Sequence, residues 1–311
     1  QEQYVLALML NGDYPRAEAY VQAHQLNQSN LLFTVKLQQL SQKILNAVQF
    51  YQSSSYRNEG EKAFYPLDAV LAEMKALSAE LPEQADLQRR FYYEYIDALN
   101  QRNRSKEVLL VAQQLNMNPQ EMPAYVRHAI ADAYLKLQQP AKAEPLYLSL
   151  FKEKNSVDYS VYAGLYYAYI EQEKFKQANQ LFQEMDKTLP TFRYSDAKGV
   201  EPTTHPDRLG YLSLKGLNYA YRNQHAKAEQ YFQNLVEHAP SNVAFQNNLA
   251  LIQRWREKPL LAEHTVSQWN GMTPISQTTQ INQMQNAQTL GDIERWRAIN
   301  HYLYQTVPDD T

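Results

Sequence analysis

A regular spacing of small residues constrains the fold of this chain more than any other feature of its sequence. Ala143 and Ala178 are 35 residues apart, and Ala228 and Ala262 are 34 residues apart. An aromatic residue follows four positions after three of these small residues, at Tyr147, Phe182 and Phe232. Such a period is typical of a supersecondary unit that buries its apolar face only by stacking on its neighbours.

A period of 34 residues with these anchors resembles the tetratricopeptide repeat. Each repeat is a pair of antiparallel helices whose close crossing needs a small side chain, and a proline such as Pro190 or Pro240 ends the second helix. The composition agrees, because only 8 glycines leave few tight turns for an all-β fold. We therefore expect an all-α fold, a tetratricopeptide-repeat superhelix of the α-solenoid type.

The period also predicts how the chain is divided. Ala178 and Ala228 are 50 residues apart, which is one repeat of 34 plus 16 further residues. We expect a degenerate helical N-terminal region at 1–123, repeats at 124–190, an inserted loop at 191–207, and C-terminal repeats at 208–311. A loop of this length inside a compact array is usually functional or disordered.

The residues that catalysis and metal binding usually require are missing or scattered. The chain has no Cys, and its seven His occur singly without an HExxH pattern. No Gly-rich phosphate loop occurs. The formal net charge is −3, whereas nucleic-acid binders usually carry a basic excess. We expect no enzyme, no cofactor, no metal site and no nucleic-acid partner.

Stacked repeats place the first helix of each pair on a concave face. Tyrosine rings on such a face offer a flat apolar surface and a hydroxyl group, and carboxylates bind cationic groups through charge-assisted hydrogen bonds. This combination suits sugar rings or an extended peptide, although acids at these positions are also compatible with plain solvation. Counting from the small residues predicts seven ligand-binding candidates: Tyr93, Asp97, Tyr125, His128, Asp132, Tyr167 and Glu171.

Several short segments between residues 124 and about 266 carry a more specific resemblance. They are Phe192-Arg193-Tyr194 after Pro190, Pro206-Asp207-Arg208-Leu209, Tyr221-Arg222-Asn223, Ala239-Pro240-Ser241-Asn242, and Arg254-Trp255-Arg256-Glu257-Lys258-Pro259 before Ala262-Glu263. This region resembles the periplasmic repeats of the PgaA family, the outer-membrane exporters of poly-β-1,6-N-acetylglucosamine. It departs from the family in the segment 254–259, where the glycine of the expected turn is missing.

The resemblance implies a periplasmic domain that precedes a C-terminal outer-membrane β-barrel, which is absent from these residues and would be the only connection to the membrane. It implies two partners, partially de-N-acetylated poly-N-acetylglucosamine and the periplasmic deacetylase. Removing acetyl groups exposes amines that are cationic near neutral pH, and an acidic, tyrosine-rich face would suit them. The lack of Cys fits an oxidising compartment.

Two alternatives remain open at this point. The first is a generic tetratricopeptide-repeat scaffold whose concave face takes a peptide or a helix of a partner protein. The second is the repeat domain of a related exporter for cellulose or alginate. A neutral polymer would not need acids such as Asp97 and Asp132 on that face.

Overall fold

The computed structural model describes residues 1–26, 28–55, 65–153, 159–188, 206–240, 242–267 and 277–306, and every regular element in these ranges is helical. The predicted all-α fold is therefore confirmed. Two compact units divide within one helix, with Gln1–Ala133 in the first and Tyr134–Thr311 in the second. Most of the predicted inserted loop at 191–207 lies outside the described residues, and the next helix begins at Pro206.

The first unit contains seven α-helices within the described ranges. They are α1 (Glu2–Leu10), α2 (Tyr14–Ala23), α3 (Gln28–Ser55), α4 (Tyr65–Leu77), α5 (Ala85–Gln101), α6 (Ser105–Gln114) and the greater part of α7 (Ala124–Lys136), with short 3-10 turns η2 (Ser78–Glu80) and η3 (Pro119–Glu121). Sequential helices pack as pairs, and α3 also lies against α5. The carboxylate of Asp13 caps α2 by accepting from the backbone N–H of Arg16.

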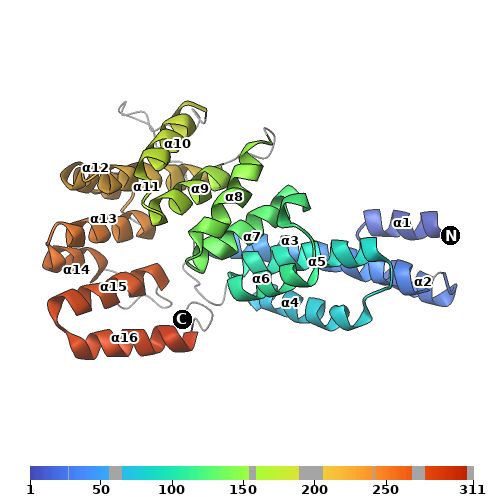
Figure 1. Ribbon diagram of the computed structural model, residues 1–311. Coiled ribbons are helices and arrows are strands. Elements are labelled where there is room, and N and C mark those ends of the chain that lie inside the picture. The colour runs from blue at the N-terminus through green and yellow to red at the C-terminus, as the bar shows by residue number, and fades with distance from the viewer. Residues whose placement is uncertain are drawn as a thin grey trace. The chain divides into compact units, whose positions relative to one another are not determined.

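The second unit continues the alternation with nine helices in its described part. They are α8 (Pro140–Phe151), α9 (Tyr159–Glu171), α10 (Phe175–Thr188), α11 (Pro206–Tyr221), α12 (His225–His238), α13 (Val243–Trp255), α14 (Pro259–Ser267), α15 (Gln277–Leu290) and α16 (Ile293–Thr306). Figure 1 shows α11/α12, α13/α14 and α15/α16 as successive antiparallel pairs, coloured from yellow to red. Helix α11 packs against both α9 and α13, so the first helices of these pairs are neighbours.

The small residues lie where the two helices of a pair cross. Ala143, Ala178, Ala228 and Ala262 are all buried, as the period predicts. The aromatic residues four positions later are buried as well, at Tyr147, Phe182 and Phe232. The Tyr147 ring lies against Gly164 and the Phe232 ring against Gly216, both glycines of first helices, so the anchors found in the sequence belong to the packing core of the repeats.

The turn between the two helices of a repeat has one residue in the left-handed region. These residues recur at 35, 35, 50, 34 and 34 positions, and their φ values run from 57° to 76°: Asn103, Gln138, Glu173, Asn223, Glu257 and Gly291. They fix the repeat register independently of the small residues. Glu257 also explains the missing glycine of the 254–259 segment, because a glutamate adopts the left-handed conformation there with a φ of 59°.

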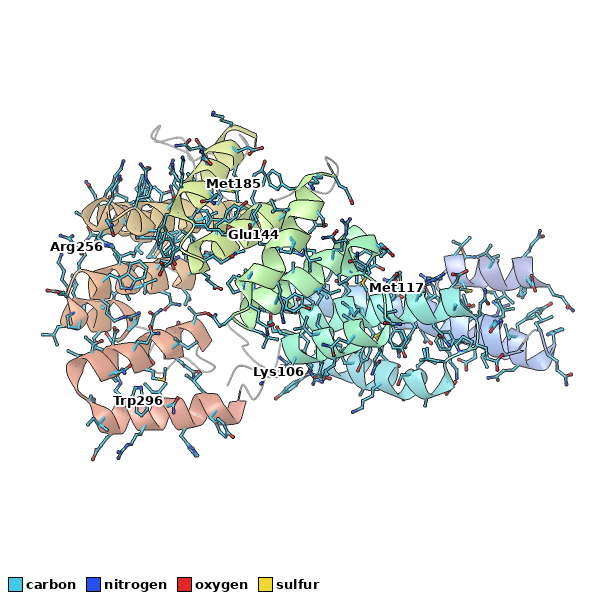
Figure 2. All side chains as sticks on the ribbon, viewed as in Figure 1. Lys106, Met117, Glu144, Met185, Arg256 and Trp296 are labelled. Carbon is cyan, nitrogen blue, oxygen red and sulfur yellow. The ribbon has the colours of Figure 1, made fainter. Side chains whose placement is uncertain are left out.

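The residue after the small residue joins successive repeats through ion pairs that the sequence reasoning did not foresee. Glu144 accepts from Lys174 at 2.6 Å, and Glu263 pairs with Arg295 at 2.7 Å. The buried Glu229 pairs with Lys258 at 3.1 Å and also with Arg256. Glu144 and Arg256 are labelled in Figure 2, at two different steps of the second unit.

The tyrosines of the described residues differ in how deeply they are buried. Tyr134, Tyr169 and Tyr219 are only half-buried. Lysine ammonium groups lie over two of these rings, with Lys227 4.3 Å from the centre of the Tyr219 ring. Among the described residues, the fully buried tyrosines are Tyr147, Tyr166 and Tyr211.

Candidate functional site

Helices α5 and α7 bring five of the predicted ligand-binding residues together in the first unit. Tyr93 and Asp97 lie one turn apart on α5, while Tyr125, His128 and Asp132 follow one another along α7. The two helices are joined at Asp132, whose Oδ2 accepts from Asn100 Nδ2 at 3.5 Å. Tyr93, Glu94, Asp97, Tyr125, His128 and Asp132 are together called the α5–α7 surface below.

The carboxylate of Asp132 has an imidazole beside it. His128 Nδ1 lies 3.5 Å from Asp132 Oδ2, one turn earlier on the same helix, and both side chains are about one quarter exposed. The His128 ring also interacts favourably with the charged form of Asp97 on α5. One imidazole therefore has two carboxyl groups near it, Asp132 on its own helix and Asp97 on α5.

Helix α3 supports the α5 side of the surface from behind. The Ser41 side chain of α3 lies close enough to the Glu94 carboxylate to lower its pKa, although the Ser41 hydroxyl donates to the backbone oxygen of Leu37 at 3.0 Å. Arg90 of α5 donates to the side-chain oxygen of Gln38 on α3. Glu94 was not among the predicted site residues. It lies one position after Tyr93, and its contact with α3 depends on a helix whose repeat register could not be found in the sequence.

Burial disfavours the charged form of two carboxylates on this surface. Desolvation raises the pKa of Glu94, and the nearby Arg90 guanidinium only partly opposes it. Desolvation also raises the pKa of Asp97, against the hydrogen bond from Gln101 and the attraction of His128. An opposite charge beside such carboxylates favours their charged form, as the Arg90 guanidinium already does for Glu94.

Tyr125 and Tyr93 add an exposed ring and a phenol hydroxyl to the α5–α7 surface. Tyr125 is 46% exposed and presents its ring to solvent. Burial, followed by the charges of Glu94 and Asp97, raises the pKa of Tyr125 to about 12, so the hydroxyl remains a hydrogen-bond donor at neutral pH. The Tyr93 hydroxyl contacts the sulfur of Met117 at 3.7 Å, and Met117 is labelled in Figure 2.

The remaining two candidates, Tyr167 and Glu171, belong to the second unit. Tyr167 is half-buried in α9, and burial raises its pKa, with a further contribution from the neighbouring Tyr221. Glu171 is the exposed last residue of α9, and partial desolvation raises its pKa. These two residues therefore share a neighbourhood with Tyr221 of α11 rather than with the acids of α5 and α7.

Neither a metal site nor a membrane-spanning helix is found among the described residues. In the ranges that the structure describes, no three His, Asp or Glu side chains have an arrangement that would hold a metal ion. None of the helices described is long and apolar enough to cross a membrane. The α5–α7 surface therefore offers hydrogen-bond acceptors, one imidazole and tyrosine rings as its chemistry.

The repeat architecture has a solved counterpart. A crystal structure of a tetratricopeptide repeat protein from Parabacteroides merdae ATCC 43184 superposes with a TM-score of 0.55 at 14% identity, covering 86% of this chain and 94% of that one. This chain has a tetratricopeptide-repeat fold. The paired helices, buried small residues and left-handed turns described above are the features that this fold requires.

The sequence comparison identifies related proteins over most of the chain. The chain is 26% identical over 263 residues to the poly-β-1,6-N-acetyl-D-glucosamine export proteins of Escherichia coli K12 and of E. coli O157:H7. This match covers 82% of the chain but only 32% of each export protein. The chain thus spans about a third of their length, and the predicted resemblance to this family is confirmed. No family model matches the chain.

Proposed function

We propose that this chain is the repeat region of a polysaccharide exporter, which binds partially de-N-acetylated poly-β-1,6-N-acetylglucosamine in the periplasm and recruits the periplasmic deacetylase. The observation that carries the proposal is the similarity to the export proteins over 82% of the chain. Those proteins are named for the export of this polymer. The binding of the polymer by this region is inferred from the chemistry of the α5–α7 surface.

The α5–α7 surface supports the part of the proposal that concerns free amines. De-N-acetylation converts an uncharged amide into an ammonium group, which carries three donors and no acceptor, like the lysine side chain. Glu94, Asp97 and Asp132 supply acceptors, and the exposed ring of Tyr125 supplies an apolar face for the sugar beside them. The surface therefore favours de-N-acetylated residues over acetylated ones.

A double substitution tests the role of the two predicted acids. Asp97→Asn with Asp132→Asn keeps the size of both side chains and removes two charges. Each partly exposed charge contact contributes about 0.7 kcal/mol, so losing two of them costs about 1.4 kcal/mol, and the double variant should bind de-N-acetylated β-1,6-linked oligomers about tenfold more weakly in calorimetric titrations. The loss should be larger at 20 mM than at 300 mM salt, because salt screens exposed charges.

Asp86→Asn is the matched control. Asp86 lies in the first turn of the same helix, and its side chain is 75% exposed beside Arg89. This variant should bind the oligomers like the wild type. Unchanged affinity in the Asp97/Asp132 double variant, or an equal loss in the Asp86 variant, would show that the α5–α7 surface does not capture the amines.

A protein-interaction scaffold is the second candidate, and the tetratricopeptide-repeat fold itself favours it. Recruitment of the deacetylase is compatible with both candidates. A pull-down with the cognate deacetylase, measured in parallel with carbohydrate titrations, separates them. If the chain binds the deacetylase but no oligomer, only the scaffold function remains supported. Preference for glucose oligomers over glucosamine oligomers would instead favour a cellulose-type exporter.

A further inference from the structure

One repeat position in the second unit carries large side chains at the ends of three neighbouring helices. It is the last residue of α9, of α11 and of α13, and in each case it lies two residues before the left-handed turn residue. These three residues, Glu171, Tyr221 and Trp255, are called the α9–α13 row. Helix α11 packs against both α9 and α13, so the row runs across adjacent repeats.

The members of the row contact one another. The ring centroids of Tyr221 and Trp255 are 5.6 Å apart with an interplanar angle of 59°. Glu171 is close enough to Tyr221 to raise the pKa of its phenol, after the larger effect of burial. Tyr167 interacts with Tyr221 as well. One carboxylate and three aromatic rings therefore form a single patch in the second unit.

Buried side chains hold the rings of the patch in place. Tyr166 is buried and lies 6.5 Å from the Tyr221 ring, and its hydroxyl donates to Asn218 Oδ1 at 3.0 Å. The His225 ring lies 6.0 Å from that of Trp255 in an edge-to-face arrangement. Although Trp255 has these two aromatic neighbours, it remains 39% exposed. A large ring that is held in position and still exposed is prepared for stacking.

The charge of the patch differs from that of the α5–α7 surface. Glu171 is its one carboxylate, and the exposed guanidinium of Arg222 lies close enough to act on the phenol of Tyr166. The cations of the next turn, Lys258 and Arg256, are already paired with Glu229. The patch therefore has no net negative charge that would favour an ammonium group, whereas the α5–α7 surface has three carboxylates and, beside Glu94, the single guanidinium of Arg90.

We propose that the α9–α13 row and Tyr167 bind the uncharged N-acetylated hexosamine rings of the polymer by stacking, with Glu171 accepting hydrogen bonds from sugar hydroxyl or amide groups. The inference rests on the proposed function, because the polymer class comes from it. A pyranose ring presents an apolar face of C–H groups to an aromatic ring, and its polar groups lie around the edge. The chain then has two subsites of different chemistry, one for each state of a partially de-N-acetylated polymer.

Trp255→Ala in the full 311-residue chain tests the proposal, with Tyr302→Ala as the matched control. Tyr302 is an exposed aromatic residue of α16 at a different repeat position. The probes are β-1,6-linked N-acetylglucosamine oligomers and the same oligomers after complete de-N-acetylation. Trp255→Ala should weaken binding of the acetylated oligomer about three- to tenfold, and should leave the salt-sensitive binding of the de-N-acetylated oligomer unchanged. Trp255→Phe keeps a ring and should retain most of the affinity.

The outcomes separate this inference from the proposed function. Binding of the de-N-acetylated oligomer alone would overturn the inference and leave the proposed function in place, and binding of neither oligomer would overturn both. Unchanged acetylated-oligomer affinity in Trp255→Ala, or an equal loss in Tyr302→Ala, would overturn the inference. So would a Trp255→Ala variant that loses only deacetylase binding, because the row would then be a protein-docking surface. A loss in Trp255→Phe as large as in Trp255→Ala would also contradict stacking.

Discussion

Gly164→Ala tests the close crossing of α8 and α9 on which the repeat stack depends. A Cβ atom added at Gly164 would lie 2.3 Å from Cζ and 2.5 Å from the hydroxyl oxygen of Tyr147, whereas ordinary contacts begin at 3.4 Å. Tyr147 is fully buried, so its ring cannot turn into solvent. The two helices must therefore separate to admit a single methyl group.

The expected loss follows from two opposing effects. Alanine is favoured over glycine inside a helix by about 1 kcal/mol. Overpacking a core costs typically about 1–3 kcal/mol, and an overlap of more than 1 Å against an immobile ring places this substitution at the upper end or beyond. The free energy of unfolding should fall by about 2 kcal/mol. For a unit that runs from Tyr134 to Thr311, this lowers the melting temperature by about 4–8 °C.

Thermal unfolding followed by circular dichroism measures the effect, and Gly210→Ala is the control. A Cβ atom at Gly210 would meet the Tyr159 ring at 2.7 Å, but Tyr159 is only half-buried and its ring can move. The control should therefore melt at the wild-type temperature or slightly higher. A Gly164→Ala protein as stable as the control would refute the close crossing, since the two substitutions differ mainly in how freely the opposing ring can move.

Three further substitutions, one of them a control, test the electrostatics and the turns. Glu94→Gln should raise the free energy of unfolding at pH 7. Because burial raises the pKa of Glu94 above its unfolded value near 4.5, the protonated side chain favours the folded state at low pH, and this contribution is lost as the pH rises through the folded pKa. At pH 7 the wild type therefore carries a disfavoured buried charge that the glutamine variant lacks. In urea unfolding the advantage should disappear near pH 4, and an equal advantage at both pH values would contradict the cause. Glu257→Gly should relieve a left-handed φ of 59°, worth about 1 kcal/mol, whereas Gln230→Gly in the exposed middle of α12 should cost about 1 kcal/mol. Equal melting temperatures for these two glycine variants would show that the turn is not strained.

The repeat register was predictable because it depends on a few residues at fixed spacing. A buried alanine at a helix crossing has almost no substitute, so Ala143, Ala178, Ala228 and Ala262 reveal the period directly. Once the period is known, equivalent positions on successive first helices follow by counting. Counting alone therefore places Asp97 and Asp132 on one face, and the fold brings both of them beside His128.

The support behind that face was not predictable by counting. Glu94 lies beside Ser41 of α3, a helix of 28 residues that does not match the repeat pattern. The ion pairs of Glu144, Glu229 and Glu263 were also missed, although each follows the small residue directly. Their partners lie about 30 residues away in the next repeat. Such side chains meet only when the repeats stack, so their pairing can be predicted only after the stacking is known.

Trp255 shows where a signal was present and was not used. It lies 34 residues after Tyr221, which is one full period, yet in the sequence it appears only as part of an unusual turn segment. The left-handed residues Asn223 and Glu257 identify the two rings as equivalent, because each ring lies two positions before one of them. The same counting that located the acids would have located the rings, had the turn been chosen as the anchor.

The two surfaces differ in what they cost the fold, and that difference bears on function. Glu94 and Asp97 are held where burial disfavours their charge, so the first unit is less stable at neutral pH than it would be with neutral side chains. A site selected for stability alone would not keep such carboxylates. The ring of Trp255 likewise exposes apolar surface to water, which a smaller side chain at this position would not do. The buried carboxylates and the exposed ring both lie on the first helices of their repeats. A ligand that neutralises the acids and covers the ring would restore the stability that these side chains give up.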